Sequence, residues 1–272
     1  MNRCFLRIVC MAAAVAGSLA GSVVLAQSSA GISTDPAVAA KAAEHTAWQN
    51  ARDAQLKNDW PWLGYYKEAD LKLGQPAAGE NRVVFMGDSI TALWNIEGAK
   101  GMFAGKPYFD RGISGQTTPQ MVLRFRQDVI DLKPKVVVIL GGTNDIAGNT
   151  GPMTLEQTEG NLASMAELAG ARGIRVVLCS VLPVFDFPWS PGLAPAGKVL
   201  VLNDWIKAYA AKNGFVYVDF HSAMKDGRGG LPSALSLDGV HPTAAGYAVM
   251  APLVEAGIDK ALKQAAKQGN RI

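Results

Sequence analysis

A regular alternation of short apolar runs with longer helical stretches, from residue 82 onward, most constrains how this chain can fold. Three of the runs are nearly continuous and rich in β-branched residues, which is typical of strands buried on both faces. The alternation predicts a five-stranded parallel sheet covered by helices on both faces, a three-layer α/β/α sandwich. The predicted strands lie at residues 83–86, 108–109, 136–140, 176–182 and 215–218, and the helices near residues 118–132, 155–172, 198–213 and 243–267.

The overall composition excludes two classes of protein. A hydrophobic fraction of 49% excludes a mostly disordered chain, and 272 residues suffice for one large α/β domain. The formal net charge is only +3 and the chain has no block of Lys and Arg, so we do not expect nucleic acid as a partner.

The N-terminus has the pattern of a secretory signal peptide. Arg3 and Arg7 precede an apolar stretch at residues 8–24, and Val24 and Ala26 are small residues at the −3 and −1 positions of a cleavage site. We therefore expect residues 1–26 to be removed and the mature protein to be periplasmic or secreted, without stable membrane insertion. An uncleaved membrane anchor is the alternative.

The remainder divides into two parts. Residues 27–81 hold a polar leader and a helix that begins near Pro36 and ends near Asn58, and we expect this segment to pack on the domain formed by residues 82–272. Cys179 is the one cysteine after the signal peptide, and its position in an apolar run predicts a buried core thiol.

Polar and glycine-containing blocks follow the predicted strands. They lie at residues 87–89, 112–115 and 141–145, and a fourth block lies near the end of the chain at residues 238–242. Because ligands of parallel α/β sheets bind outside the carboxyl ends of the strands, these blocks are expected to converge at one edge. Each block alone is typical of an ordinary turn.

Together, the four blocks contain the groups that ester hydrolysis requires. Ser89 can act as nucleophile, His241 as its base, and Asp238 as the group that orients the His241 ring. The N–H groups of Ser89 and Gly115 and the side-chain amide of Asn144 can form an oxyanion hole.

These motifs resemble the GDSL (SGNH) hydrolase superfamily, whose four name-giving residues match Ser89, Gly115, Asn144 and His241. The resemblance implies a flavodoxin-like sandwich, the same roles for these residues, Asp238 as the third triad member, and no cofactor or metal. Within the superfamily, three motifs are similar to those of a bacterial branch near platelet-activating-factor acetylhydrolase catalytic subunits, which includes carbohydrate acetylesterases. The motifs are Gly-Asp-Ser-Ile-Thr, Arg-Gly-Ile-Ser-Gly-Gln-Thr and Gly-Thr-Asn-Asp.

Four neighbouring residues need separate interpretations. His221 follows the last predicted strand and is an alternative candidate for the base. Asp88 and Asp145 flank the predicted catalytic positions and are expected to fix the two turns by accepting backbone N–H groups. Arg111 precedes the Gly115 block and can pair with a carboxylate, and the sequence assigns it no role.

The loop at residues 183–192 emerges at the same edge and contains three aromatic residues. Phe185, Phe187 and Trp189 can wall an acyl pocket or stack on a sugar; the alternative is that they cover the sheet edge. We recognise no long apolar groove for a fatty chain, which favours a short acyl group such as acetyl.

The sequence thus predicts a serine esterase that acts on short-chain esters of a small molecule or glycan through a covalent acyl-serine. A lysophospholipase or thioesterase for longer acyl chains would use the same chemistry. A non-catalytic carbohydrate-binding or scaffold protein is a third hypothesis, and a metal-dependent hydrolase with Asp88, Asp145, Asp238 and His241 as ligands is a fourth.

Overall fold

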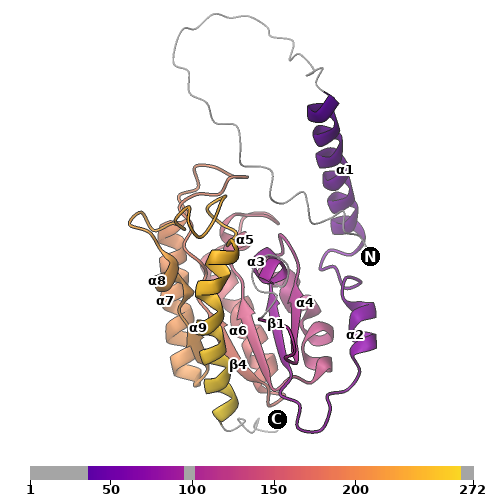
Figure 1. Cartoon of the computed structure of the whole chain (residues 1–272), viewed down its shortest axis with the longest axis vertical. Coiled ribbons are helices and arrows are strands. Elements are labelled where there is room, and N and C mark those ends of the chain that lie inside the picture. Colours follow the sequence, from indigo (N-terminus) through magenta and orange to yellow (C-terminus); the bar gives the residue numbers. More distant parts are fainter. Residues whose placement is uncertain (1–35, 95–101, 265–272) are drawn as a thin grey trace, which may run out of the picture. The chain divides into compact units, whose positions relative to one another are not determined.

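The computed structural model describes residues 36–94 and 102–264, so the predicted signal peptide and polar leader lie outside the described residues. Five strands form one parallel sheet in the order β2-β1-β3-β4-β5, with helices on both faces (Figure 1). This confirms the predicted α/β sandwich. The strands are β1 (Val83–Gly87), β2 (Tyr108–Gly112), β3 (Val136–Leu140), β4 (Arg175–Cys179) and β5 (Val216–Val218).

The helices of the described residues agree closely with the predicted stretches, and short helices follow several strands. They are α1 (Pro36–Asn58), α2 (Lys67–Leu73), α3 (Ser89–Leu93), α4 (Thr118–Asp128), α5 (Thr143–Ile146), α6 (Leu155–Gly170), α7 (Ala196–Asn213), α8 (Phe220–Met224), α9 (Ala244–Lys263) and the 3₁₀ turn η2 (Ile130–Leu132).

Two strand boundaries differ from the prediction for physical reasons. Strand β2 continues through polar residues to Gly112, because it pairs along its whole length with β1. Strand β4 ends at Cys179, although the apolar run continues to Leu182. Beyond Cys179, the Asn203 side chain makes the hydrogen bonds that a neighbouring strand would otherwise make. It accepts the Val181 N–H at 2.7 Å and donates to the Val181 carbonyl at 2.9 Å.

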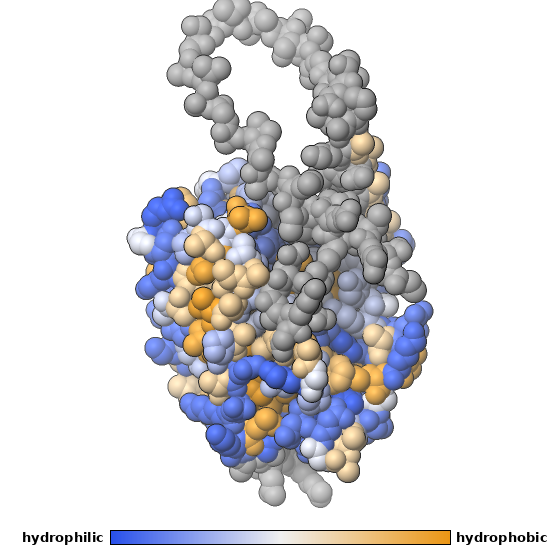
Figure 2. Space-filling model, viewed as in Figure 1, coloured by the Kyte–Doolittle hydropathy of each residue, from blue (hydrophilic) through white to orange (hydrophobic). Residues whose placement is uncertain are grey.

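Successive side chains of the central strands point into two separate cores. Val84 and Met86 pack with residues of α4, α6 and α7, whereas Val83 and Phe85 pack with residues of α3, α8 and α9. Cys179 belongs to the second core, and burial raises the pKa of its thiol, as expected for an unreactive cysteine. Figure 2 shows apolar residues over the outward face of the N-terminal half of α9, among mixed hydrophilic surface.

The chain forms two compact units, one ending at Trp60 and one beginning at Pro61. In the second unit, the segment before the sheet is held on β2. Tyr66 donates its hydroxyl to the Gly112 carbonyl at 2.6 Å, and Asp70 pairs with Arg111 at 2.5 Å. Asp70 is therefore the carboxylate with which Arg111 pairs. No helix in the described ranges is both long and apolar enough to cross a membrane.

Candidate active site

Ser89 lies at a sharp turn between β1 and α3, where two glycines permit very close packing. A Cβ atom on Gly87 would lie 2.0 Å from the Thr91 hydroxyl oxygen, and one on Gly112 would lie 2.3 Å from the Ala92 nitrogen. Asp88 caps α3 by accepting the Ile90 N–H at 2.9 Å. The turn therefore places Ser89 as the first residue of the helix, at the carboxyl edge of the sheet.

Three residues from distant parts of the chain form a continuous hydrogen-bonded line. The Ser89 Oγ lies 2.9 Å from His241 Nε2, and His241 Nδ1 lies 2.6 Å from Asp238 Oδ2. If Nδ1 carries the proton that Asp238 accepts, Nε2 is left as an acceptor for the Ser89 hydroxyl. The structure thus brings together the three residues that the sequence predicted as a triad.

The Asp238 carboxylate is fixed by its own loop. Its Oδ1 accepts the N–H groups of His241 and Val240 at 2.8 and 2.9 Å and the Ser236 hydroxyl at 3.1 Å. Burial opposes ionisation of Asp238, but the hydrogen bond and charge of His241 and the backbone N–H groups outweigh it and hold its pKa well below the usual value. Asp238 is therefore ionised and oriented toward the His241 ring.

The other two predicted oxyanion donors, Gly115 and Asn144, lie in segments that are hydrogen-bonded to the Ser89 turn or to each other. Gly115 has a φ of +77°, a left-handed conformation that favours glycine. Asn144 lies in α5 and is buried, and its Nδ2 donates to the Gln116 carbonyl at 3.0 Å and to Asp88 Oδ2 at 3.3 Å. Because Gln116 and Asp88 are the sequence neighbours of Gly115 and Ser89, the Asn144 amide joins both loops.

The structure adds one residue that sequence reasoning missed. Asn149 donates its side-chain Nδ2–H to Asn144 Oδ1 at 2.7 Å and accepts the Trp189 indole N–H at 3.1 Å. The first bond fixes which end of the Asn144 amide carries the hydrogens. In the sequence, Asn149 stands in the run Gly-Asn-Thr-Gly, which reads as a turn. The sequence signal that could have identified Asn149 is its position five residues after Asn144.

Residues 85–249, more than half of the chain, match the GDSL-like lipase/acylhydrolase family. The chain belongs to this family of ester hydrolases. Esterase TesA from Pseudomonas aeruginosa is 31% identical over 189 residues, covering 64% of this chain and 85% of that protein. A GDSL-like lipase from Bacteroides thetaiotaomicron has a crystal structure with 43% identity and a TM-score of 0.72, covering 75% of this chain and 100% of that chain. Acetylxylan esterase Axe2 from Geobacillus stearothermophilus shares the fold, with a TM-score of 0.54 and 23% identity. The match covers 66% of this chain and 94% of that chain.

The two acidic neighbours of the family motifs fix turns, as predicted. Asp145 accepts the Thr118 N–H at 3.1 Å as well as the Thr118 hydroxyl, which joins α5 to the start of α4. Asp88 caps α3. Burial raises the pKa of Asp88 to about 6, because the Ile90 N–H and the charge of His241 offset its desolvation only in part.

The three aromatic residues of the 183–192 loop have different environments. Trp189 is 44% exposed and its ring centroid lies 6.2 Å from that of His241, so it borders the site. Phe185 is exposed and lies under the Arg228 guanidinium, 5.2 Å from it. Phe187 is completely buried in the core. The predicted substrate contact of Phe187 is therefore wrong, because it has no exposed surface; its ring instead supports Trp189 at 5.1 Å.

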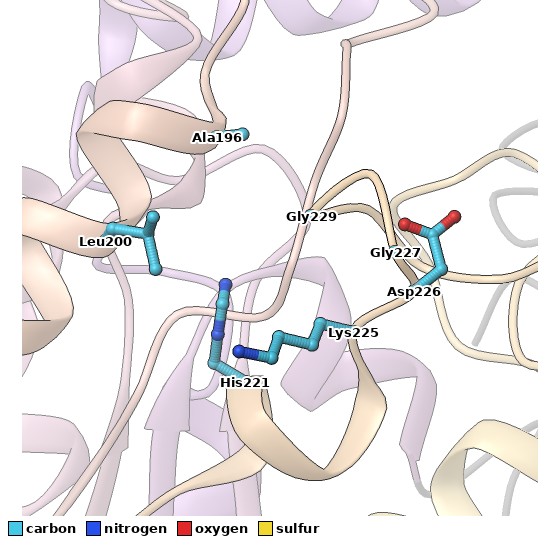
Figure 3. Close-up of a pocket in the computed structure, with 7 residues that line it drawn as sticks. All are labelled: Ala196, Leu200, His221, Lys225, Asp226, Gly227 and Gly229. Atoms are coloured by element: carbon cyan, nitrogen blue, oxygen red, sulfur yellow. The ribbon is translucent and has the colours of Figure 1, made fainter.

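His221 does not take the place of His241. It lies in α8, beyond β5, where its ring lines a separate cavity together with Lys225 (Figure 3). The hydroxyl of Ser89 is hydrogen-bonded to His241. In the part of the chain that the structure describes, no three His, Cys, Asp or Glu side chains are grouped so that they could hold a metal ion.

Proposed function

We propose that this chain is a serine esterase that removes short acyl groups, acetyl above all, from a carbohydrate or a similar alcohol. The observation that carries the proposal is the line from Ser89 Oγ through the His241 ring to Asp238, with hydrogen-bond distances of 2.9 and 2.6 Å. Membership of an ester hydrolase family supports the same reaction class.

In this proposal, Ser89 Oγ attacks the ester carbonyl carbon while His241 Nε2 takes its proton. Asp238 stabilises the resulting imidazolium. When the tetrahedral intermediate collapses, His241 gives the proton to the departing alcohol and an acyl-Ser89 remains. A water molecule, deprotonated by His241, then attacks the acyl carbon, releases the acid and restores the Ser89 hydroxyl.

The negative charge on the substrate oxygen is assigned to three donors: the N–H groups of Ser89 and Gly115 and the Nδ2–H of Asn144. Asn144 donates one hydrogen to Gln116 at 3.0 Å and the other to Asp88 at the longer distance of 3.3 Å. The longer bond is the weaker one, so the hydrogen that points toward Asp88 is the one that the oxyanion can share. A single donor of this kind is typically worth about 3 kcal/mol in the transition state.

The surroundings of these donors favour a small acyl group. Gln116, Asn149 and Thr117 surround Asn144 and Gly115, and each is engaged in hydrogen bonds. These polar side chains give a long aliphatic chain no apolar surface to pack against. The half-exposed ring of Trp189 beside His241 offers a flat apolar surface against which a sugar ring can stack.

The predicted signal peptide at residues 1–26 supports a periplasmic or secreted location for the mature enzyme. N-terminal sequencing of the protein recovered from the periplasm or medium tests this part. The proposal requires Gln27 as the first residue, and an intact N-terminus in the membrane fraction contradicts it.

Hydrolysis of p-nitrophenyl acetate by the wild-type protein and by Ser89→Ala tests the chemistry. We expect turnover by the wild type only; equal rates contradict the proposal.

A series of p-nitrophenyl esters of increasing chain length then tests the acyl preference. The second candidate is a long-chain ester hydrolase, favoured by the 43% identity to a GDSL-like lipase. A maximum at eight carbons or more would select it, and binding of an acetylated glycan without turnover would select a non-catalytic protein.

A further inference from the structure

A cavity of about 290 Å³ opens at the carboxyl end of β5, separate from the Ser89 turn (Figure 3). Its walls come from the first turns of α7 (Ala196 and Leu200), from His221 in α8, and from the loop at residues 225–229. The volume is at the lower end of the range for small-molecule sites, so it suits one sugar-sized unit rather than a polymer.

His221 is the buried polar group of this cavity. Only 5% of the residue is exposed, and its backbone N–H donates to the Ser180 hydroxyl at 2.9 Å. None of the described residues makes a hydrogen bond to its ring, and the ring lines the cavity. Because the ring faces the cavity, its nitrogen atoms can reach a bound molecule, and the ring can donate a hydrogen bond to a ligand there.

Two positive features adjoin the His221 ring. The Lys225 side chain extends toward it, with the ammonium group beside the ring (Figure 3), and Lys225 has no ion-pair partner among the residues that the structure describes. The other feature is the N-terminus of α7, an 18-residue helix that begins after Pro195 without a side-chain cap or an acidic residue in its first turn. The N-terminal end of such a helix favours negative charge.

One carboxylate lines the same cavity, but it is already neutralised. Asp226 accepts the N–H groups of Arg228 and Gly230 at 2.8 and 2.9 Å and lies 3.3 Å from the Arg228 guanidinium. In Figure 3 its carboxylate points away from His221 and Lys225. The positive charge of Lys225 therefore remains available to a ligand.

We propose that this cavity binds the carboxylate of a small ligand such as a sugar acid. Lys225 forms the ion pair, His221 donates a hydrogen bond, and Ala196 and Leu200 contact the carbon skeleton. A neutral ligand offers the exposed Lys225 ammonium no opposite charge, whereas a carboxylate can accept hydrogen bonds from the ammonium and from the ring together.

The cavity wall is joined to the aromatic loop that borders the candidate active site. A Cβ atom on Gly230 would lie 2.8 Å from the Phe185 Cβ, and Arg228 lies over the Phe185 ring. Phe185 is in the same loop as Trp189, whose ring lies near His241. If the proposed esterase function holds, the carboxylate can belong to the alcohol portion of the substrate, as in an acetylated uronic acid; otherwise it belongs to a free acid.

Binding is tested with the full chain by calorimetric titration of D-glucuronate, with D-glucose as the matched neutral probe. We expect glucuronate to bind measurably and glucose not to bind. Lys225→Met, on an exposed side chain, should weaken glucuronate binding on the order of tenfold, and His221→Gln should weaken it as well. Lys212→Met, at the other end of α7, is the control and should bind as the wild type does. Equal behaviour of the two sugars, or unchanged binding by Lys225→Met, overturns the proposal.

A second measurement separates the two sources of the carboxylate. If it belongs to the substrate, KM should be lower for acetylated glucuronate than for acetylated glucose in the wild type, and the two values should converge in Lys225→Met. Equal KM values with glucuronate binding retained support a free acid as the ligand. Glucuronate binding without any turnover of p-nitrophenyl acetate leaves this inference standing and contradicts the proposed function.

Discussion

Two histidines lie at the carboxyl edge of the same sheet, and their surroundings assign them different chemistry. The His241 ring is hydrogen-bonded on both sides, to Asp238 and to Ser89. The His221 ring has no such partners among the described residues, and it is buried next to the ammonium of Lys225. Burial first, and the charge of Lys225 second, lower the pKa of His221. Both rings lie at the same edge of the sheet, so in the proposed mechanism it is the hydrogen-bond partners of His241 that make it the base.

The largest effect should come from the nucleophile. Ser89→Ala removes the hydroxyl that His241 holds, and we expect kcat for p-nitrophenyl acetate to fall by about 10⁴-fold or more. Ser222→Ala, on the exposed face of α8, is the matched control and should retain full activity. Steady-state kinetics with both variants would show whether another hydroxyl at this edge does the chemistry, in which case Ser89→Ala would remain active.

Replacing each histidine tests the comparison directly. His241→Gln should lower kcat by roughly 10⁴-fold, because the proton of Ser89 then has no acceptor of suitable basicity. His221→Gln should leave p-nitrophenyl acetate turnover within about twofold of the wild type, since its ring does not touch the triad. The same assay, run on folded protein checked by circular dichroism, measures both. Similar losses in the two variants would remove the distinction between the histidines.

A smaller effect is expected at Asn149. In Asn149→Asp the donor to Asn144 Oδ1 is lost while the shape is kept, so the Asn144 amide is no longer fixed for oxyanion binding. We expect kcat to fall about tenfold with little change in KM, because the Asn144 amide binds the charged substrate oxygen only in the transition state. Trp189→Phe, which removes the indole N–H but keeps a ring beside His241, should show a weaker form of the same change. A rise in KM alone, or a fall that tracks lost thermal stability, would reduce Asn149 to a structural residue.

The smallest effect concerns stability, and it contrasts the two carboxyl groups that flank the site. Asp238 has a depressed pKa, whereas burial raises the pKa of Asp88 to about 6. Because Asp88 binds its proton more tightly in the folded state, its contribution to stability is fully present below pH 4 and is lost as the pH rises through 6. Between those values the free energy of unfolding should fall by about 2 kcal/mol more in the wild type than in Asp88→Asn. Denaturant titrations at pH 4 and 7.5 measure this difference; parallel slopes would show that Asp88 does not titrate in this range.

The sequence predicted the sheet and the residues that meet at its edge because both follow from local patterns. Continuous β-branched runs specify buried parallel strands, and parallel strands bring Ser89, Gly115 and Asn144 to one edge wherever the helices lie. The side-chain contacts between segments that are distant in the sequence could not be predicted in this way. Nothing local shows that Asn203 replaces a strand beside Val181, or that Asp70 pairs with Arg111. Phe187 and Trp189 are two residues apart in one loop, yet one is buried and the other exposed, since the loop's path depends on tertiary contacts.

The most direct test of the account is to identify the residue that becomes covalently modified during turnover. A fluorophosphonate probe should label the wild-type protein once, and mass spectrometry of the digested protein should place the label on Ser89. Labelling should be strongly reduced in His241→Gln and unchanged in His221→Gln. A label on another residue, or none on a protein that hydrolyses p-nitrophenyl acetate, would contradict the claim that Ser89 is the nucleophile and His241 its base.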